Sequence, residues 1–252
     1  GKSKATFEVK LMRANKKSLL FTILWLMPVL AGFAILLDYH SRAGPAPDPP
    51  QTWPRSSKLE KPLNKQILLV FLHPKCPCSA ATISELARLL PRLRETQVIA
   101  VLTIPAGAPP QFANTEALDR LRSIPGLAII TDTNAQETRN FKAVTSGEVL
   151  LYDKSGHLRF CGGITPGRGH QGDSAGKDML EIISSVNSGK KSTGVEIQPG
   201  VKATAEGTYV CPIFGCPLLH DSEQLSETSA LSDRANKTIP PGKSIRELSF
   251  TK

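Results

Sequence analysis

Cysteine is the residue type in this chain best suited to chemistry, and four of the five cysteines fall into two close pairs. Cys76 and Cys78 are separated only by Pro77; they follow the apolar run 67–73 (ILLVFLH) and precede apolar residues at helical spacing. A turn from a buried strand into a helix exposes free backbone N–H groups and the positive end of the helix dipole, which stabilise a thiolate. We therefore expect Cys76 to attack and Cys78 to resolve, with His73 beside them.

The one-residue spacer leaves two kinds of chemistry open. A disulfide across one residue closes a small, strained ring, and Pro77 makes closure harder, so the pair is either a readily reduced switch or two thiols that never close. Soft thiolates also suit zinc and cuprous copper. The alternative to redox chemistry is therefore metal handling by the same two cysteines, with further candidate ligands in Cys211, Cys216 and His170.

The second pair, Cys211 and Cys216, lies in the stretch CPIFGC near the end of the chain. Four intervening residues that include a glycine make a tight loop, and two close thiols in an oxidising space favour a disulfide. We expect a structural bridge here; the alternatives are a second redox pair that relays electrons, or two metal ligands that fold back over Cys76. Cys161 stands alone after Phe160 and is expected to be a buried thiol.

The elements that must position these cysteines alternate between strand and helix. Apolar runs predict strands, periodic segments predict helices, and a glycine turn at 154–156 predicts a hairpin. This order favours an α/β fold, a mixed sheet with helices on both faces. The expected strands are 67–73, 97–103, 127–131, 148–153 and 157–165, and the expected helices are 80–90, 115–123, 135–141 and 173–186.

The direction of the hairpin brings one more loop to the cysteine edge. Its second strand, 157–165, is expected to run parallel to the strand before Cys76, so the carboxyl ends of both lie at the same edge. The loop 166–173 (PGRGHQGD) follows that strand. Arg168 and His170 in this loop are candidates to orient a substrate, act as a base or bind a metal.

A cysteine motif in the turn between a buried strand and its helix, followed by this order of elements, resembles the thioredoxin fold over residues 64–188. With a single anchor the chain is similar to membrane-tethered thioredoxin-like proteins of bacterial envelopes. The segments FLHPKCPCSAAT, LLYDKSGHLRFCGGITPGRGHQGD and CPIFGCPLL resemble the RedB-like group more narrowly. The thioredoxin resemblance implies a thiol–disulfide oxidoreductase or a redox sensor without a cofactor, whereas the narrower RedB-like resemblance implies little about activity.

Two features depart from the thioredoxin pattern. Thioredoxins place two residues between their cysteines, whereas Pro77 alone lies between Cys76 and Cys78. Thioredoxin-like proteins also carry a cis-proline beside the cysteines, but here the stretch 143–147 reads AVTSG. Thr145 in this stretch is a candidate at the edge of the site. Without the proline we expect the thiols to be more open to a metal.

The amino-terminal region predicts a membrane anchor. Residues 18–37 contain no charge and are long enough to span a bilayer as a helix. Six cations precede them in residues 1–17, so the positive-inside rule puts this tail in the cytoplasm and the rest of the chain outside. We expect an uncleaved anchor in a bacterial inner membrane and a periplasmic domain; a cleaved signal peptide is the alternative.

The remaining segments are expected to be extended or disordered. Residues 38–63 form a proline-rich linker that holds the domain off the bilayer without packing. Residues 189–220 form an extension that carries the second cysteine pair, and the polar residues 221–252 form a disordered tail.

The charge distribution argues against a nucleic-acid partner. The net charge of +9 includes +5 from residues 1–17, whereas residues 66–188 carry only +1. A nearly neutral folded part has no surface that would attract phosphates. The expected partners are the membrane and a protein thiol or disulfide.

Overall fold

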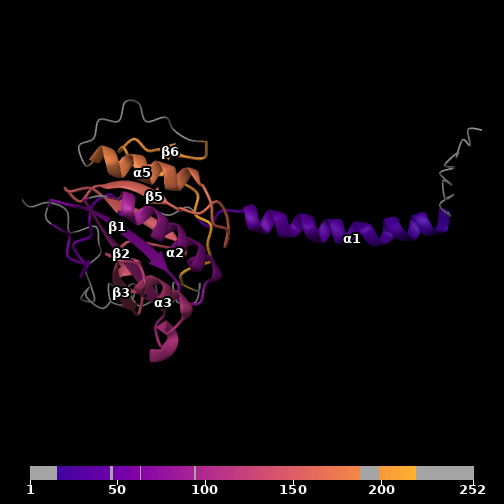
Figure 1. The fold of residues 1–252 in the computed structure, drawn as a ribbon, viewed down its shortest axis with the longest axis horizontal. Helices are drawn as coiled ribbons and strands as arrows, with labels where there is room; N and C mark the ends of the chain where they lie inside the picture. The colour runs from indigo at the N-terminus through magenta and orange to yellow at the C-terminus, as the bar shows by residue number, and fades with distance from the viewer. Residues whose placement is uncertain (1–15, 46–47, 63, 94, 188–198, 220–252) are drawn as a thin grey trace, which may run out of the picture. The chain divides into compact units, whose positions relative to one another are not determined.

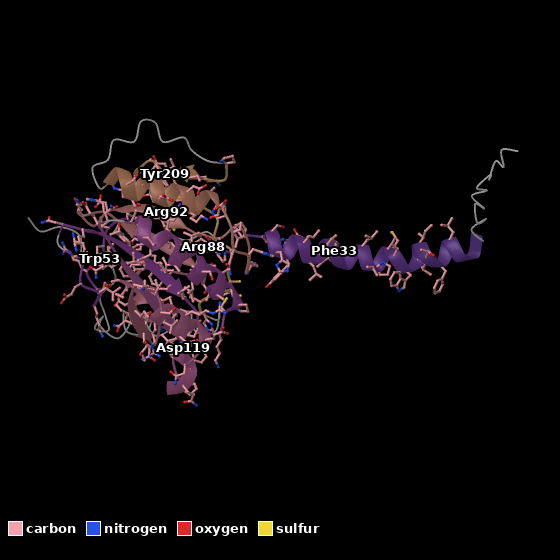
Figure 2. All side chains as sticks on the ribbon, in the orientation of Figure 1. Phe33, Trp53, Arg88, Arg92, Asp119 and Tyr209 are labelled. Atoms are coloured by element: carbon pink, nitrogen blue, oxygen red, sulfur yellow. The ribbon has the colours of Figure 1, made fainter. Side chains whose placement is uncertain are left out.

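The computed structural model describes residues 16–45, 48–62, 64–93, 95–187 and 199–219. The chain divides after Arg42 into two units. The first contains helix α1 (Lys16–Ser41), whose apolar stretch Leu19–Ser41 includes an 18-residue window with a mean hydropathy of 2.4 and no buried residue. Large apolar side chains such as Phe33 project from it (Figure 2). By length and composition this helix is able to cross a membrane, and the predicted span 18–37 lies within it.

The second unit is built on one seven-stranded sheet with the order β3-β2-β1-β4-β5-β7-β6. Strands β1, β2 and β3 are parallel, and β4 is antiparallel to both β1 and β5, so β5 runs in the direction of β1, as expected. The strands are β1 (Gln66–Leu72), β2 (Thr96–Ile104), β3 (Ala128–Thr133), β4 (Glu148–Tyr152), β5 (Leu158–Gly162), β6 (Lys202–Ala203) and β7 (Tyr209–Val210).

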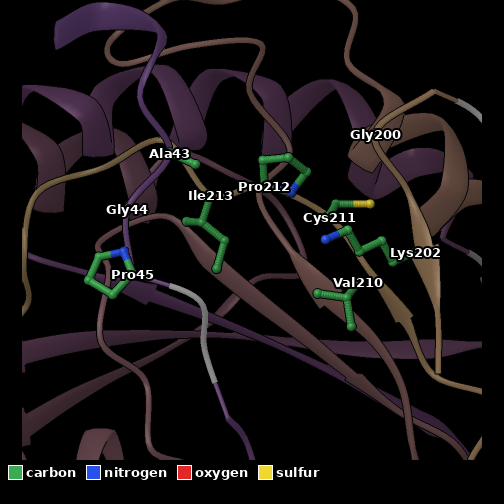
Figure 3. A pocket seen from close by; sticks show the side chains of 9 residues that line it. All are labelled: Ala43, Gly44, Pro45, Gly200, Lys202, Val210, Cys211, Pro212 and Ile213. Carbon is green, nitrogen blue, oxygen red and sulfur yellow. The ribbon is translucent and has the colours of Figure 1, made fainter.

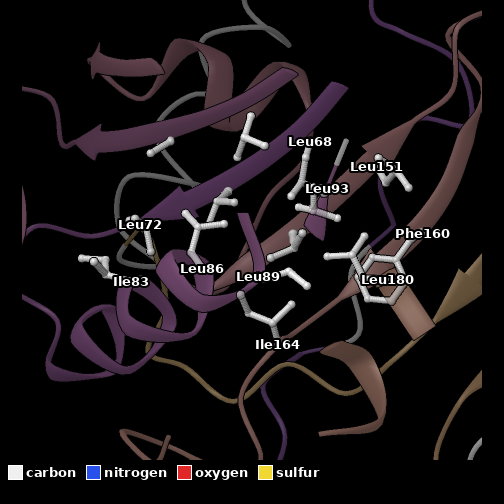
Figure 4. Close-up of a cluster of buried hydrophobic side chains, with 14 of the residues drawn as sticks. Leu68, Leu72, Ile83, Leu86, Leu89, Leu93, Leu151, Phe160, Ile164 and Leu180 are labelled. Atoms are coloured by element: carbon white, nitrogen blue, oxygen red, sulfur yellow. The ribbon is translucent and has the colours of Figure 1, made fainter. Parts of the chain in front are cut away.

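Helices cover both faces of this sheet. Consecutive residues of its central strands are apolar, so both faces of these strands have to be buried. Leu68 and Leu72 of β1 belong to one buried cluster with side chains of α2, α3 and α5; Figure 1 shows these helices, and Figure 4 shows part of the cluster. Leu69 and Phe71 belong to the second cluster, which includes Phe141 next to α4. The helices are α2 (Pro77–Leu89), α3 (Glu116–Arg122), α4 (Gln136–Asn140) and α5 (Ala175–Asn187), with short 3-10 turns at Leu90–Arg92 and Pro110–Ala113. The predicted mixed α/β sheet with a thioredoxin-like order is confirmed.

Much of the predicted linker is part of this unit. Trp53 packs edge-on against Phe141 and Tyr152, with ring centroids 4.9 and 5.4 Å away. Its backbone N–H donates to the Gly156 carbonyl at 2.8 Å, and the Ser57 hydroxyl donates to Glu137. The expectation that residues 38–63 would not pack is therefore wrong for the stretch 48–62, because its aromatic ring and its backbone find partners on the domain.

Replacing Trp53 tests whether this stretch stabilises the domain. Trp53→Ala removes the aromatic contacts of a partly buried ring, and we expect the free energy of unfolding to fall by about 2 kcal/mol. Urea unfolding of the full-length protein measures it. Trp53→Phe keeps an edge-on ring and serves as the matched control with a smaller loss. A change below about 0.5 kcal/mol for Trp53→Ala would mean that the stretch lies on the domain without stabilising it.

Part of the predicted extension 189–220 forms the last two strands of the sheet. Strand β7 pairs in parallel with β5, and β6 pairs with β7. After β7 the chain enters residues 211–219, here called the covering segment. The Ser146 N–H donates to the Cys216 carbonyl at 2.8 Å, and the Leu218 N–H donates to the Val144 carbonyl at 2.9 Å. The covering segment thus runs antiparallel to residues 144–146. The predicted tail 221–252 and the basic residues 1–15 lie outside the described residues.

Candidate functional site

Cys76 lies at the point where the chain turns from β1 into α2, as the sequence predicts. It is the N-cap residue of α2, with an extended backbone (φ −87°, ψ 123°), and Pro77 occupies the first helical position. Proline suits that position because its fixed φ matches a helix and its missing N–H would have no helical partner. Cys78 follows in the first turn, and its backbone N–H lies against the Cys76 sulfur.

A third cysteine joins this pair. The sulfur atoms of Cys76, Cys78 and Cys216 all lie within 4.8 Å of one another, and we call these residues the three-thiol cluster. All five cysteines are unpaired. The expected bridge between Cys211 and Cys216 is therefore not formed, because the pairing of the covering segment with residues 144–146 carries Cys216 to Cys76.

Cys211 has a separate environment. It is buried, and its backbone N–H donates to the Cys161 carbonyl at 2.9 Å. Its side chain contacts Gly162 closely and lines a mostly apolar cavity of about 180 Å³ with residues 43–45 (Figure 3). Burial raises the pKa of Cys211 to about 11, and the buried Cys161 thiol also has a raised pKa for the same reason. Cys161 is buried, as predicted.

Two residues hold Cys216 in place. Gly215 passes so close to the sheet edge that a Cβ on it would lie 1.9 Å from the Ser146 carbonyl oxygen, so only glycine fits there. Arg168, from the loop after β5, donates a guanidinium hydrogen bond to the Gly215 carbonyl. The prediction that the 166–173 loop reaches the cysteine edge is thus confirmed for Arg168, which contacts the backbone next to Cys216.

The cluster stabilises one negative charge. The pKa of Cys76 falls from 9.0 to about 4, chiefly because the Cys78 thiol donates to its sulfur; burial opposes this fall, and the thiol and N–H of Cys216 and the N–H of Cys78 add to it. The pKa of Cys78 is raised because it donates to Cys76 and is buried. Burial and then the contact with Cys76 raise the pKa of Cys216. At neutral pH the cluster therefore holds one thiolate and two thiols.

The other predicted residues lie around the cluster without joining it. His73 supports the turn: its backbone N–H donates to the Ser146 hydroxyl at 3.0 Å, and its Nδ1 accepts the Lys75 N–H at 3.3 Å. Thr145 is fully buried and bridges to Pro217 of the covering segment. His170 is exposed, in a turn with Gly167. Among the described residues, the group of close potential metal ligands at this site contains cysteines only.

The covering segment bears on the exposure of the thiols. Among the described residues there is no cis peptide bond, in line with the missing proline. Cys76 is only 5% exposed and Cys78 only 7%, whereas Cys216 is partly exposed. Residues 211–219 of the same chain pair with residues 144–146, where a thioredoxin-like protein would carry its proline. That the thiols are more open to a metal without the proline stays a prediction.

Sequence reasoning missed two buried glutamates, Glu148 next to the site edge and Glu85 in α2. Glu148 is fully buried at the start of β4, and its Oε2 accepts the N–H of Val144 at 3.0 Å and that of Thr145 at 3.4 Å. Burial raises its pKa from 4.5 to about 7. Glu85 of α2 is also buried and accepts the Gly172 N–H at 2.8 Å. An acidic residue within an apolar pattern is the signal that marks both positions.

No family model and no curated protein matches this chain. Several solved structures are similar. A hypothetical protein from Sinorhizobium meliloti 1021 is 17% identical, with a TM-score of 0.49, covering 70% of this chain and 97% of that one. MTB DsbF is 16% identical, with a TM-score of 0.35, and the match covers 50% of this chain and 82% of that one. A SCO1/SenC family lipoprotein from Bacillus anthracis is 10% identical, with a TM-score of 0.37 and the same two coverages. Because these scores are below 0.5, the fold assignment rests on the chain's own strand order.

Proposed function

We propose that this chain is a membrane-tethered thiol–disulfide oxidoreductase or redox sensor that works through the Cys76 thiolate. The observation that carries the proposal is the position of Cys76 at the start of α2 with two further cysteine sulfurs within 4.8 Å, an arrangement that lowers the pKa of Cys76. Thiol–disulfide exchange needs a thiolate and a second thiol within reach, and the three-thiol cluster supplies both.

The stabilised thiolate also sets the direction of the reaction. A low pKa favours the reduced form of a dithiol relative to its disulfide, so the oxidised protein tends to accept electrons from other thiols. In the net reaction two external thiols lose two electrons and form a disulfide, while two cysteines of the cluster gain those electrons and become thiols.

The setting that we propose is the periplasmic face of a bacterial inner membrane. Helix α1 supplies a segment long enough to span the bilayer, and the cations of residues 1–17 favour a cytoplasmic amino terminus. The sheet unit would then lie in an oxidising compartment, where exchangeable disulfides persist.

Reaction with glutathione disulfide tests this function. We expect the reduced full-length protein in detergent to lose two thiols and to release two glutathione molecules for each disulfide consumed. Cys161→Ala and Cys211→Ala, which change buried cysteines outside the cluster, are the matched controls and should react like the wild type. Absence of any thiol loss, or equal slow oxidation of all five cysteines, would contradict the proposed function.

Metal handling is a second candidate, because three sulfurs lie close enough to share one ion. Sulfurs bound to one zinc at about 2.3 Å lie roughly 4 Å apart, and soft thiolates also suit cuprous copper. In this case Cys76, Cys78 and Cys216 would hold the ion, without a histidine.

Metal titration separates the two candidates. If the cluster is a metal site, the reduced full-length protein should retain one equivalent of zinc or cuprous copper against a moderate chelator. Cys216→Ser should weaken this binding at least about tenfold, since the loss of a ligand is costly in a three-ligand site, whereas Cys211→Ala should not. A reduced wild-type protein that retains neither ion would exclude the metal function.

A further inference from the structure

We infer that the redox disulfide of this protein joins Cys76 to Cys216, and that Cys78 remains a thiol. This inference rests on the proposed function and names the second cysteine of the reaction. It replaces the expectation from the sequence, in which Cys78 resolves. The observation behind it is the geometry of the three-thiol cluster, in which a distant segment supplies the third sulfur.

The local chain opposes a disulfide between Cys76 and Cys78. Only Pro77 separates them, and its ring fixes φ at the first position of α2. The disulfide would close a small ring through this rigid residue. It would also have to form without unwinding the first turn of α2, whose residues 78 and 79 are buried. The Cys78 thiol instead donates to the Cys76 sulfur, which is the role of a donor that stays protonated.

Cys216 does not carry this constraint. It belongs to the covering segment, which two backbone hydrogen bonds hold against residues 144 and 146, and its sulfur lies within 4.8 Å of the Cys76 sulfur. A disulfide between residues so far apart in sequence closes no small ring, so no local ring strain opposes the bond between these two sulfurs. Burial and the contact with Cys76 raise the pKa of Cys216, and the charge of Arg168, which donates to the neighbouring Gly215 carbonyl, partly offsets this rise.

Exposure and leaving-group ability give the order of the steps. In the oxidised protein an external thiolate attacks the sulfur of Cys216, the more exposed of the two. The bond between Cys76 and Cys216 breaks, a new bond joins the external sulfur to Cys216, and Cys76 leaves as its stabilised thiolate. A second external thiolate then attacks the external sulfur, which releases an external disulfide and a Cys216 thiolate that takes a proton from water. Two electrons pass from the external thiols to Cys76 and Cys216.

Disulfide mapping of the wild-type protein tests the pairing without any substitution. Reduced full-length protein is oxidised with glutathione disulfide, quenched in acid, alkylated and digested. We expect a linked peptide pair that contains Cys76 and Cys216, with Cys78 alkylated. A disulfide between Cys76 and Cys78 with Cys216 alkylated would overturn the pairing while leaving the proposed function intact. If no thiol is lost, both the pairing and the proposed function fail.

Single substitutions give an independent test of the same pairing. In Cys76→Ser the glutathione adduct should persist on Cys216 at least about a hundredfold longer than in the wild type, because the intramolecular thiolate that displaces glutathione is gone. Cys78→Ser should still form the linked pair of Cys76 and Cys216, and Cys211→Ala, in the same segment but outside the cluster, should behave like the wild type. Failure of Cys78→Ser to form that pair would overturn the inference.

Gly215→Ala tests the positioning of Cys216 with every thiol retained. The added methyl group would meet the Ser146 carbonyl oxygen, so the covering segment must shift away from Cys76. We expect the yield of the linked pair to fall at least about tenfold and the alkylation of Cys76 to become dependent on pH, because the Cys216 donors are lost. An unchanged yield would contradict the placement of Cys216 by this close contact.

Discussion

Cys76 should react with a small alkylating reagent at a rate that hardly changes between about pH 5 and about pH 8. A thiol with an ordinary pKa near 8.5 gains nearly a thousandfold in rate over the same range, because its thiolate fraction rises by that factor. A pKa of about 4 means that Cys76 is already ionised at the lower end of the range. Timed alkylation of the full-length protein, followed by mass spectrometry of the Cys76 peptide, measures the rate.

The controls for this experiment follow from the donors around the sulfur. Cys78→Ala removes the thiol that lowers the pKa of Cys76 most, and Cys216→Ala removes a weaker donor. Both variants should show a rate that rises with pH, more steeply for Cys78→Ala. Cys211→Ala changes a cysteine of the covering segment outside the cluster and should keep the flat profile. A steep profile for Cys76 in the wild type would show that the cluster does not stabilise a thiolate.

Glu148→Gln should stabilise the protein at about pH 8 and have little effect near about pH 4.5. The pKa of Glu148 is raised from 4.5 to about 7 by burial, so the folded state binds this proton more tightly than the unfolded state. The resulting stability is fully present below the unfolded pKa and is lost as the pH rises through the folded pKa. A shift of this size corresponds to about 3 kcal/mol. Glutamine still accepts the N–H groups of Val144 and Thr145 through its carbonyl oxygen.

Urea unfolding of wild type and variant at the two pH values measures this effect. The difference in unfolding free energy between the two proteins isolates Glu148 from Cys76, whose titration is common to both. We expect the difference to change by about 2 to 3 kcal/mol in favour of Glu148→Gln as the pH rises. A difference that is the same at both pH values would show that Glu148 does not titrate between them.

The parts of the fold that the sequence predicts are those encoded locally. The run 67–73 is apolar at every position except its last, and β1 is buried on both faces. The same reasoning places the hairpin of β4 and β5 and the helix that follows Cys76. Cys76 itself could be placed because its environment, the end of a strand and the start of a helix, depends only on neighbouring residues.

The position of Cys216 could not be predicted in this way. It depends on the pairing of the covering segment with residues 144–146, two short irregular stretches that have no repeating apolar pattern. The nearness of Cys211 in the sequence favoured a local bridge, whereas the long-range pairing decides the outcome. The packing of Trp53 could not be predicted for a related reason. The prolines around it indicate an extended chain, but they do not indicate which part of the domain that chain contacts.

The reduction potential of the cluster shows whether Cys76 is a stabilised redox thiolate. The full-length protein is equilibrated with glutathione buffers of graded ratio, and its thiols are counted at each ratio. Stabilisation of the Cys76 thiolate predicts a single two-electron transition at a potential less reducing than the value of about −270 mV for thioredoxin. A more reducing potential, or no transition across the series, would contradict the account of Cys76 as a stabilised redox thiolate.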